Sequence, residues 1–96
     1  MIAISKKPKV PLGKCVATFA ALDAIKRAGQ SPLDFLQRHG QGDWGEVCGE
    51  DWELNDAALQ DGTRILSAYR TALKAKIWVI TEADREVTTI LLPDEY

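Results

Sequence analysis

The sequence has 96 residues, 46% of them hydrophobic, and a formal net charge of −2 at pH 7. This length suits one domain, and the charge gives no electrostatic case for binding DNA, RNA or an anionic membrane. Cys15 and Cys48, the only cysteines, are too few for a cysteine-based zinc site within one chain. No apolar run is long enough for a signal peptide or a membrane span, so we expect a cytoplasmic protein with both thiols reduced and buried.

The start of the chain is predicted to be an N-terminal arm, residues 1–11, followed by a single domain, residues 12–96. Pro8 and Pro11 favour extended neighbours, and Lys6, Lys7 and Lys9 make the arm basic. A solvated tail accounts for three lysines better than a contact with phosphate does. Gly13 to Ala17 is a candidate for a short strand that joins the sheet formed further along the chain.

A first helix is predicted over residues 18–28. Thr18 suits the N-cap, Lys26 and Arg27 suit the last turn, and Gly29 suits the stop. Apolar residues recur every three positions along one predicted face, at Phe19, Leu22, Ile25 and Ala28. The pattern is typical of a helix that packs on a core.

Ser31 and Pro32 begin a second helix, which Arg38 and His39 close before Gly40. Its inward residues are expected to be Leu33, Phe35 and Leu36. The glycine-rich residues 40–45 predict a tight loop pinned by Trp44. Acidic residues then favour the start of a third helix, about 50–60, with an apolar surface made by Trp52, Leu54, Ala58 and Leu59.

Three β-type runs follow: Ile65–Tyr69, Ile77–Thr81 and Val87–Leu92. Short polar connections between them predict a three-stranded antiparallel meander. The fold class is therefore α+β, with three helices packed on a small antiparallel sheet to which one N-terminal strand is a candidate addition. Strand alternation predicts that Trp78 and Ile80 face the helices together with Ile90 and Leu92.

The first candidate site combines Arg38, His39, Asp43 and Trp44. His39 is the only histidine, and its position at a helix end favours the charged imidazole. It is a candidate general acid or base near neutral pH. The alternative is structural: His39 caps carbonyls, Trp44 anchors the core, and Asp43 bonds the loop backbone.

The second candidate site is the connection Thr81–Glu86. Glu82 is a candidate base and Arg85 a candidate cation for phosphate. The alternative is a charged hairpin turn in which Thr81 and Asp84 bond local backbone groups. On a neighbouring strand, Ser67 and Tyr69 share one face, whereas Arg70 points to the other. The common nucleotide, metal and nucleophile motifs are absent, so we expect no metal and no cofactor.

Four segments carry a resemblance: RHGQGDWG (38–45), Asn55, RILSAY (64–69) and WVITEADREVTTILLPDEY (78–96). Over about residues 12–96 the chain resembles a group of short bacterial proteins labelled "plasmid-related" or type I restriction–modification subunits. The resemblance implies a role in plasmid or mobile-element biology. A restriction subunit is excluded, because 96 residues cannot hold a methyltransferase fold with its cofactor site.

A second similarity is architectural. Helices followed by an antiparallel sheet, with a histidine before it, are similar to the barnase, EndoU, colicin and RelE-like ribonucleases. That similarity implies His39 as acid or base, Glu82 as its complement, and Arg85 or Arg70 as the stabiliser of the phosphorane charge. Such nucleases are usually basic, whereas this chain is acidic.

Two functions therefore stand as predictions. The first is a small accessory protein that binds a macromolecular partner, expected to be another protein, with neither a membrane nor a small-molecule cofactor. Its predicted binding residues are Arg38, Asp43, Trp44, Tyr69, Thr81 and Asp84. The second is a metal-independent ribonuclease of the toxin type, which makes RNA the partner and His39, Glu82 and Arg85 the catalytic residues.

Overall fold

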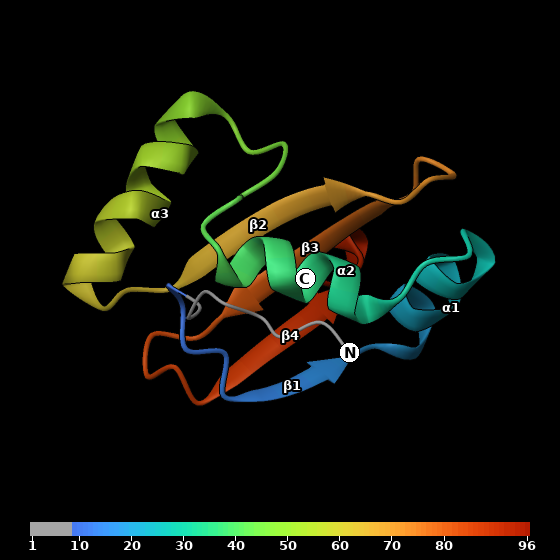
Figure 1. The fold of residues 1–96 in the computed structure, drawn as a ribbon, viewed down its shortest axis with the longest axis horizontal. Coiled ribbons are helices and arrows are strands. Elements are labelled where there is room, and N and C mark those ends of the chain that lie inside the picture. The colour runs from blue at the N-terminus through green and yellow to red at the C-terminus, as the bar shows by residue number, and fades with distance from the viewer. Residues whose placement is uncertain (1–8) are drawn as a thin grey trace, which may run out of the picture.

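The computed structural model describes residues 9–96 and shows one four-stranded sheet with three α-helices (Figure 1). The elements are, in chain order, β1 (Lys14–Ala17), α1 (Phe19–Arg27), α2 (Pro32–Gly40), α3 (Gly49–Asp61), β2 (Ile65–Arg70), β3 (Lys76–Thr81), β4 (Val87–Leu91) and the 3₁₀ helix η1 (Pro93–Glu95). The predicted α+β class is confirmed. No helix within residues 9–96 is both long enough and apolar enough to cross a membrane.

The sheet has the strand order β1-β4-β3-β2. β2, β3 and β4 form the predicted antiparallel meander, with Ser67 opposite Val79 and Val79 opposite Ile90. The N-terminal strand does join the sheet, but β1 lies parallel to β4 and makes the sheet mixed. Parallel strands need a long connection, and here three helices, β2 and β3 lie between β1 and β4 in the chain.

The main core lies between the helices and one face of the sheet. Ile25 of α1 and Phe35 of α2 are buried there against Tyr69, Val79 and Ile90. A second cluster, under α3, is formed by Val10, Trp44, Ala58 and Ile65. Figure 1 shows α2 lying across the sheet, with α1 at one end and α3 outside β2.

The caps of the first two helices agree with the sequence. The N–H of Ala21 donates to the Thr18 hydroxyl at 3.1 Å, and Ser31 and Asp34 form a capping box. The inward residues differ from the prediction. In α1 the buried residues are Ala21 and Ile25, four apart, whereas Phe19 is 86% exposed. Leu22, Leu33 and Leu54, also predicted to be inward, are exposed as well.

The prediction that Trp78 faces the helices is wrong. Ile77 and Val79 of β3 are fully buried on the helix side, so the alternate residues Trp78 and Ile80 lie on the other face. Trp78 there meets the C-terminal Tyr96 edge-on, with 5.7 Å between the ring centroids. Because Ile77–Ile80 is apolar without a break, its pattern does not determine which alternate residues face the core.

The described end of the predicted arm is packed on the domain. Val10 is fully buried, and the N–H groups of Lys9 and Val10 both donate to the Gly40 carbonyl. Lys6 and Lys7 lie outside the described residues. The prediction that the cysteines are buried is also wrong, because Cys15 on β1 and Cys48 before α3 are both free and exposed.

Candidate functional site

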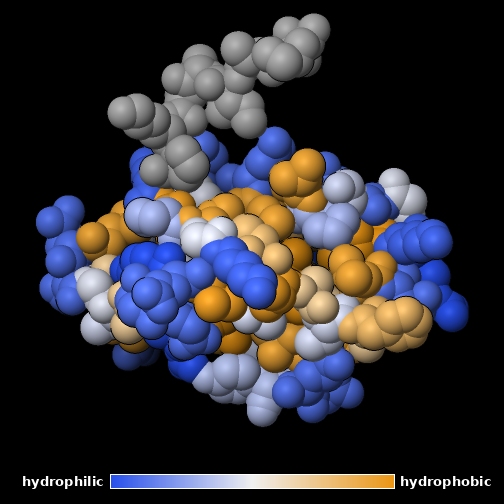
Figure 2. Space-filling model, turned by 90° about the horizontal axis from the view of Figure 1, so that it is seen from below, coloured by the Kyte–Doolittle hydropathy of each residue, from blue (hydrophilic) through white to orange (hydrophobic). Residues whose placement is uncertain are grey.

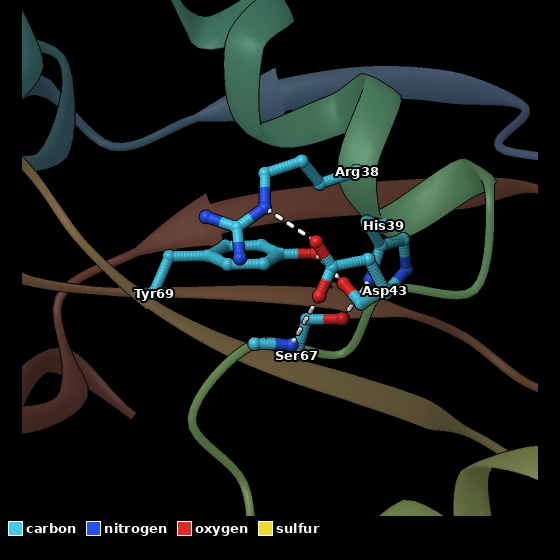
Figure 3. A network of polar contacts seen from close by, with 6 residues as sticks. Arg38, His39, Asp43, Ser67 and Tyr69 are labelled. Atoms are coloured by element: carbon cyan, nitrogen blue, oxygen red, sulfur yellow. Dashed lines mark hydrogen bonds and ion pairs between the residues drawn. The ribbon is translucent and has the colours of Figure 1, made fainter.

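The fold brings together six of the residues that the sequence singled out. Arg38 and His39 end α2, Asp43 and Trp44 follow in the loop, and Tyr69 and Thr81 lie on the sheet beneath. Figure 3 shows Arg38, His39, Asp43 and Tyr69 together with Ser67. The two rings of His39 and Trp44 are 5.7 Å apart, edge to face. Glu82, Asp84 and Arg85 occupy the β3–β4 hairpin instead.

His39 lies at the centre of this cluster with no accessible surface. Its Nδ1 is 2.6 Å from the Ser67 hydroxyl on β2, and its Nε2 is 2.8 Å from the Thr81 hydroxyl on β3. Both ring nitrogens therefore have partners. The register of the sheet accounts for this position, because Ser67 and Thr81 share the face that carries Val79 and Ile90, on which α2 packs.

The hydrogen-bond network also determines the tautomer. The Thr88 hydroxyl donates to the Leu12 carbonyl at 2.7 Å, so its oxygen can only accept from Thr81, 2.7 Å away. The Thr81 proton is thereby used, and the Thr81 oxygen accepts from His39 Nε2–H. Nδ1 is left as the acceptor for the Ser67 hydroxyl. Donation thus runs from His39 through both threonines to the backbone of residue 12.

Burial lowers the pKa of His39 to about 4, and the nearby positive charge of Arg85 acts in the same direction. The sequence prediction of a charged imidazole at the helix end is therefore wrong. Desolvation outweighs the helix dipole, and His39 is neutral at physiological pH. Because the ring is enclosed and both of its nitrogens are hydrogen-bonded inside the protein, neither nitrogen is open to exchange a proton with a substrate in this structure.

Arg38 differs from its neighbour because its side chain is 46% exposed. Its Nε donates to an Asp43 carboxylate oxygen at 2.7 Å, and its Cζ lies 4.5 Å from the centre of the Tyr69 ring. The Tyr69 hydroxyl in turn donates to the Asp43 carbonyl at 2.6 Å. Figure 3 shows the guanidinium over the tyrosine ring, beside the carboxylate.

Both members of the Arg38–Asp43 ion pair are held in their charged forms. The hydrogen bond to Asp43 raises the pKa of Arg38, and the same bond lowers the pKa of the Asp43 carboxyl. The second Asp43 oxygen accepts the Gly45 N–H at 3.1 Å, which is the loop-backbone bond expected from the sequence. Arg38 is therefore held from two sides, while no hydrogen bond of its two Nη groups is formed within residues 9–96.

Trp44 is surrounded by the protein in the way that a core residue is. It is fully buried, and its Nε1–H donates to an Asp56 oxygen on α3 at 2.9 Å. Thr81 and Tyr69 are buried too. Of the six residues brought together, only Arg38 and Asp43 present their side chains to solvent.

The second candidate site, Thr81–Glu86, forms the β3–β4 hairpin, which is hydrogen-bonded to the C-terminal end of α3. Arg85 has a φ of 62°, and its Nη groups donate to the carbonyls of Thr63 at 2.6 Å and Ala58 at 2.8 Å. Asp84 accepts the Glu86 N–H at 2.9 Å, as expected for a turn. Glu82 is exposed, whereas His39 is fully buried. The two residues predicted to form an acid–base pair therefore do not share access to solvent.

Sequence reasoning overlooked Thr88 and the carbonyl of Leu12, which complete the network. Thr88 alternates with Ile90, and a hydroxyl in a core position was the available signal. Within residues 9–96 every buried side-chain nitrogen and oxygen has a hydrogen-bond partner. No group of three or more histidine, cysteine, aspartate or glutamate side chains in that range is placed to hold a metal ion.

A shallow hollow of about 260 Å³ lies elsewhere, between α3 and β2. It is lined by Val47, Asp51, Leu54, Asn55, Arg64 and Leu66. None of these is among the predicted site residues. Comparison with protein families, with curated proteins and with solved structures gave no match to this chain.

Proposed function

We propose that this chain is a non-catalytic binding protein whose partner is another protein. One observation carries the proposal: at the cluster under α2, the acid–base group is enclosed and the accessible side chains are those of the Arg38–Asp43 ion pair. Such a surface is able to bind a partner, whereas the imidazole beneath it is not accessible to one. A role as an accessory protein of a plasmid or mobile element is part of the proposal and rests on the sequence resemblance alone.

Arg38 is the contact residue of this proposal. Arginine is enriched among the residues that dominate protein interfaces, and a guanidinium fixed before binding loses less entropy when it binds. Its Nη groups suit a bidentate contact with a carboxylate of the partner. Stacking on Tyr69 and the bond to Asp43 supply the fixation.

The surroundings favour a protein over RNA. Asp43 and Glu46 flank the exposed arginines, in ion pairs with Arg38 and Arg70 at 2.7 and 2.8 Å. The whole chain is acidic, and a polyanion gains little from such a surface. Large apolar side chains that are more than half exposed add area that a protein partner would bury. They are Phe19, Leu33, Leu54, Leu73 and Tyr96.

The ribonuclease alternative requires His39 to reach a phosphodiester, and it is tested by incubating labelled single-stranded RNA with the protein and a chelator at low salt. We expect no cleavage above background by the native protein or by the His39→Gln variant. Cleavage by the native protein that is lost in His39→Gln would establish the nuclease and contradict the proposal.

Binding is tested by comparing Arg38→Gln with Arg27→Gln. Arg27 is the matched control, because it too is an exposed arginine in an ion pair, with Asp23 at 2.8 Å. The variants are expressed in a bacterial host carrying the plasmid or element that encodes the chain, and proteins crosslinked to each are quantified by mass spectrometry. We expect a protein crosslinked to the native chain and to Arg27→Gln, and reduced about tenfold or more with Arg38→Gln. Equal recovery with both variants would contradict the assignment of Arg38.

A further inference from the structure

The two edges of the sheet are constructed differently. At the β2 edge, Leu66 is paired by the Asn55 amide, which donates to its carbonyl at 2.7 Å and accepts its N–H at 3.3 Å. Ala68 donates to the Trp44 carbonyl and accepts the Glu46 N–H at 2.6 Å. A Cβ at Gly45 would collide with the Ala68 carbonyl, so only glycine allows this approach. The outward backbone groups of both residues are thus paired, which prevents association at this edge.

The β1 edge has no such protection within residues 9–96. The N–H groups of Lys14 and Thr18 donate to the carbonyls of Glu86 and Ile90 on the β4 side, at 2.8 and 3.0 Å. Backbone direction alternates along a strand, so Cys15 and Ala17 direct their N–H and C=O groups away from the sheet. Cys15 is exposed, and Val16 is 38% exposed. Figure 2 shows this side of the molecule, where hydrophobic side chains reach the surface between charged ones.

We propose that a second copy of the chain pairs with this edge, antiparallel, about a twofold axis at Val16. Cys15 of each copy then lies opposite Ala17 of the other. Directly opposed residues of this kind exchange both backbone bonds, so every outward N–H and C=O of β1 is paired. The two sheets become one continuous sheet. The inference goes beyond the proposed function and does not depend on it.

The ends of β1 allow only this register. An axis at Cys15 would place Ala17 opposite Gly13, which has a φ of 63° and is not extended. An axis at Ala17 would place Cys15 opposite Phe19, which is already in α1. An axis at Val16 alone keeps the residues that exchange backbone bonds, Cys15 and Ala17, within the strand.

The side chains of the two copies are complementary in this register. Val16 meets Val16 of the other copy on the face that the helices leave open. Lys14 of each copy lies opposite Thr18 of the other. Because the Thr18 hydroxyl donates to the Glu95 carboxylate at 2.7 Å, Lys14 of each copy approaches the Glu95 carboxylate of the other. Phe19, the most exposed large hydrophobic side chain within residues 9–96, begins α1 just past each end of the paired strands.

The register is tested by disulfide trapping in the full chain carrying Cys48→Ser. Adding Ala17→Cys places a cysteine opposite Cys15 of the other copy, at the Cα separation of about 5.5 Å that a disulfide spans. We expect mild oxidation to give a covalent dimer as the main product. A third substitution, Cys15→Ser, should remove most of the dimer, because residues 17 of the two copies are only diagonal neighbours. Equal trapping with and without Cys15 would overturn the register.

Association itself is tested by sedimentation velocity from micromolar to millimolar protein. Ala17→Pro removes an N–H that points away from β4, so the sheet and the circular dichroism spectrum should be preserved. We expect the native chain and Ala17→Ser to dimerise with rising concentration, and Ala17→Pro to need at least tenfold more protein. A native chain that stays monomeric throughout, or an Ala17→Pro variant that dimerises equally, would overturn the proposal.

Discussion

A histidine at the C-terminal end of a helix normally gains from being charged, because the last carbonyls carry partial negative charge. His39 occupies such a position, yet its pKa is lowered to about 4 by burial. Its ring is bonded by two hydroxyls and by no carboxylate, so no nearby negative charge compensates the desolvation of an imidazolium. The residue that most resembled a catalytic group thus links α2 to β2 and β3.

This arrangement predicts a pH dependence of stability. The folded pKa of His39 lies below its ordinary value of 6.5, so the unfolded chain binds the proton more readily. The contribution of His39 to the free energy of unfolding is therefore fully present above pH 6.5 and is lost as the pH falls towards 4. The loss amounts to about 3 kcal/mol.

Urea unfolding of the native chain and His39→Gln between pH 7 and 4 measures this dependence. Glutamine does not titrate, and carboxylates contribute equally to both proteins, so their difference isolates His39. We expect the native protein to lose about 3 kcal/mol more than the variant over this range. If the free energy of unfolding fell equally with pH in both proteins, His39 would not be buried in a way that lowers its pKa.

At the scale of elements, the sequence predicted the existence and order of helices and strands because their signals are local. Thr18 and Ser31 mark helix starts because their hydroxyls accept backbone N–H groups, and Gly29 follows the end of α1 with a φ of 70°. The parallel pairing of β1 was not predictable from the strand itself, because nothing within four residues specifies a partner at the other end of the chain. The buried faces were also mispredicted, at Phe19 and at Trp78, because large apolar residues were assumed to be inward.

The candidate site shows the same division. Arg38, His39, Asp43 and Trp44 are close in sequence, and strand alternation placed Ser67 and Tyr69 on one face, so most of the cluster could be predicted. The enclosure of His39 could not, because it depends on Thr81, Thr88 and Leu12 arriving from distant segments. Arg85 was read as a free cation, whereas the αL turn directs it to the carbonyls that end α3.

The corrected orientation of β3 predicts unequal effects of two neighbouring substitutions. Ile77 is fully buried against the helices, whereas Trp78 is only partly buried and rests on Tyr96. We expect Ile77→Ala to lower the free energy of unfolding by about 2–5 kcal/mol and Trp78→Ala by less, although tryptophan loses more atoms. Chemical denaturation measures both, and a larger loss for Trp78→Ala would return that side chain to the core.

For the whole molecule, the network centred on His39 connects parts that the chain order keeps apart. It joins the segment before β1 to β4, β4 to β3, and both β2 and β3 to α2. These contacts hold α2 against the sheet, and α2 presents Arg38 at its outer end. Under the proposed function, these buried polar groups serve to position the surface that carries Arg38.

The most direct measurement of this account is a ¹⁵N NMR titration of the imidazole, which is unambiguous because the chain has a single histidine. We predict a neutral ring protonated at Nε2, with chemical shifts that stay constant from pH 8 to 5 and change only near pH 4. The hydrogen-bond directions and the burial both require that result. A ring that titrates near its ordinary value of 6.5, or that carries its proton on Nδ1, would contradict it and would return His39 to the candidates for catalysis.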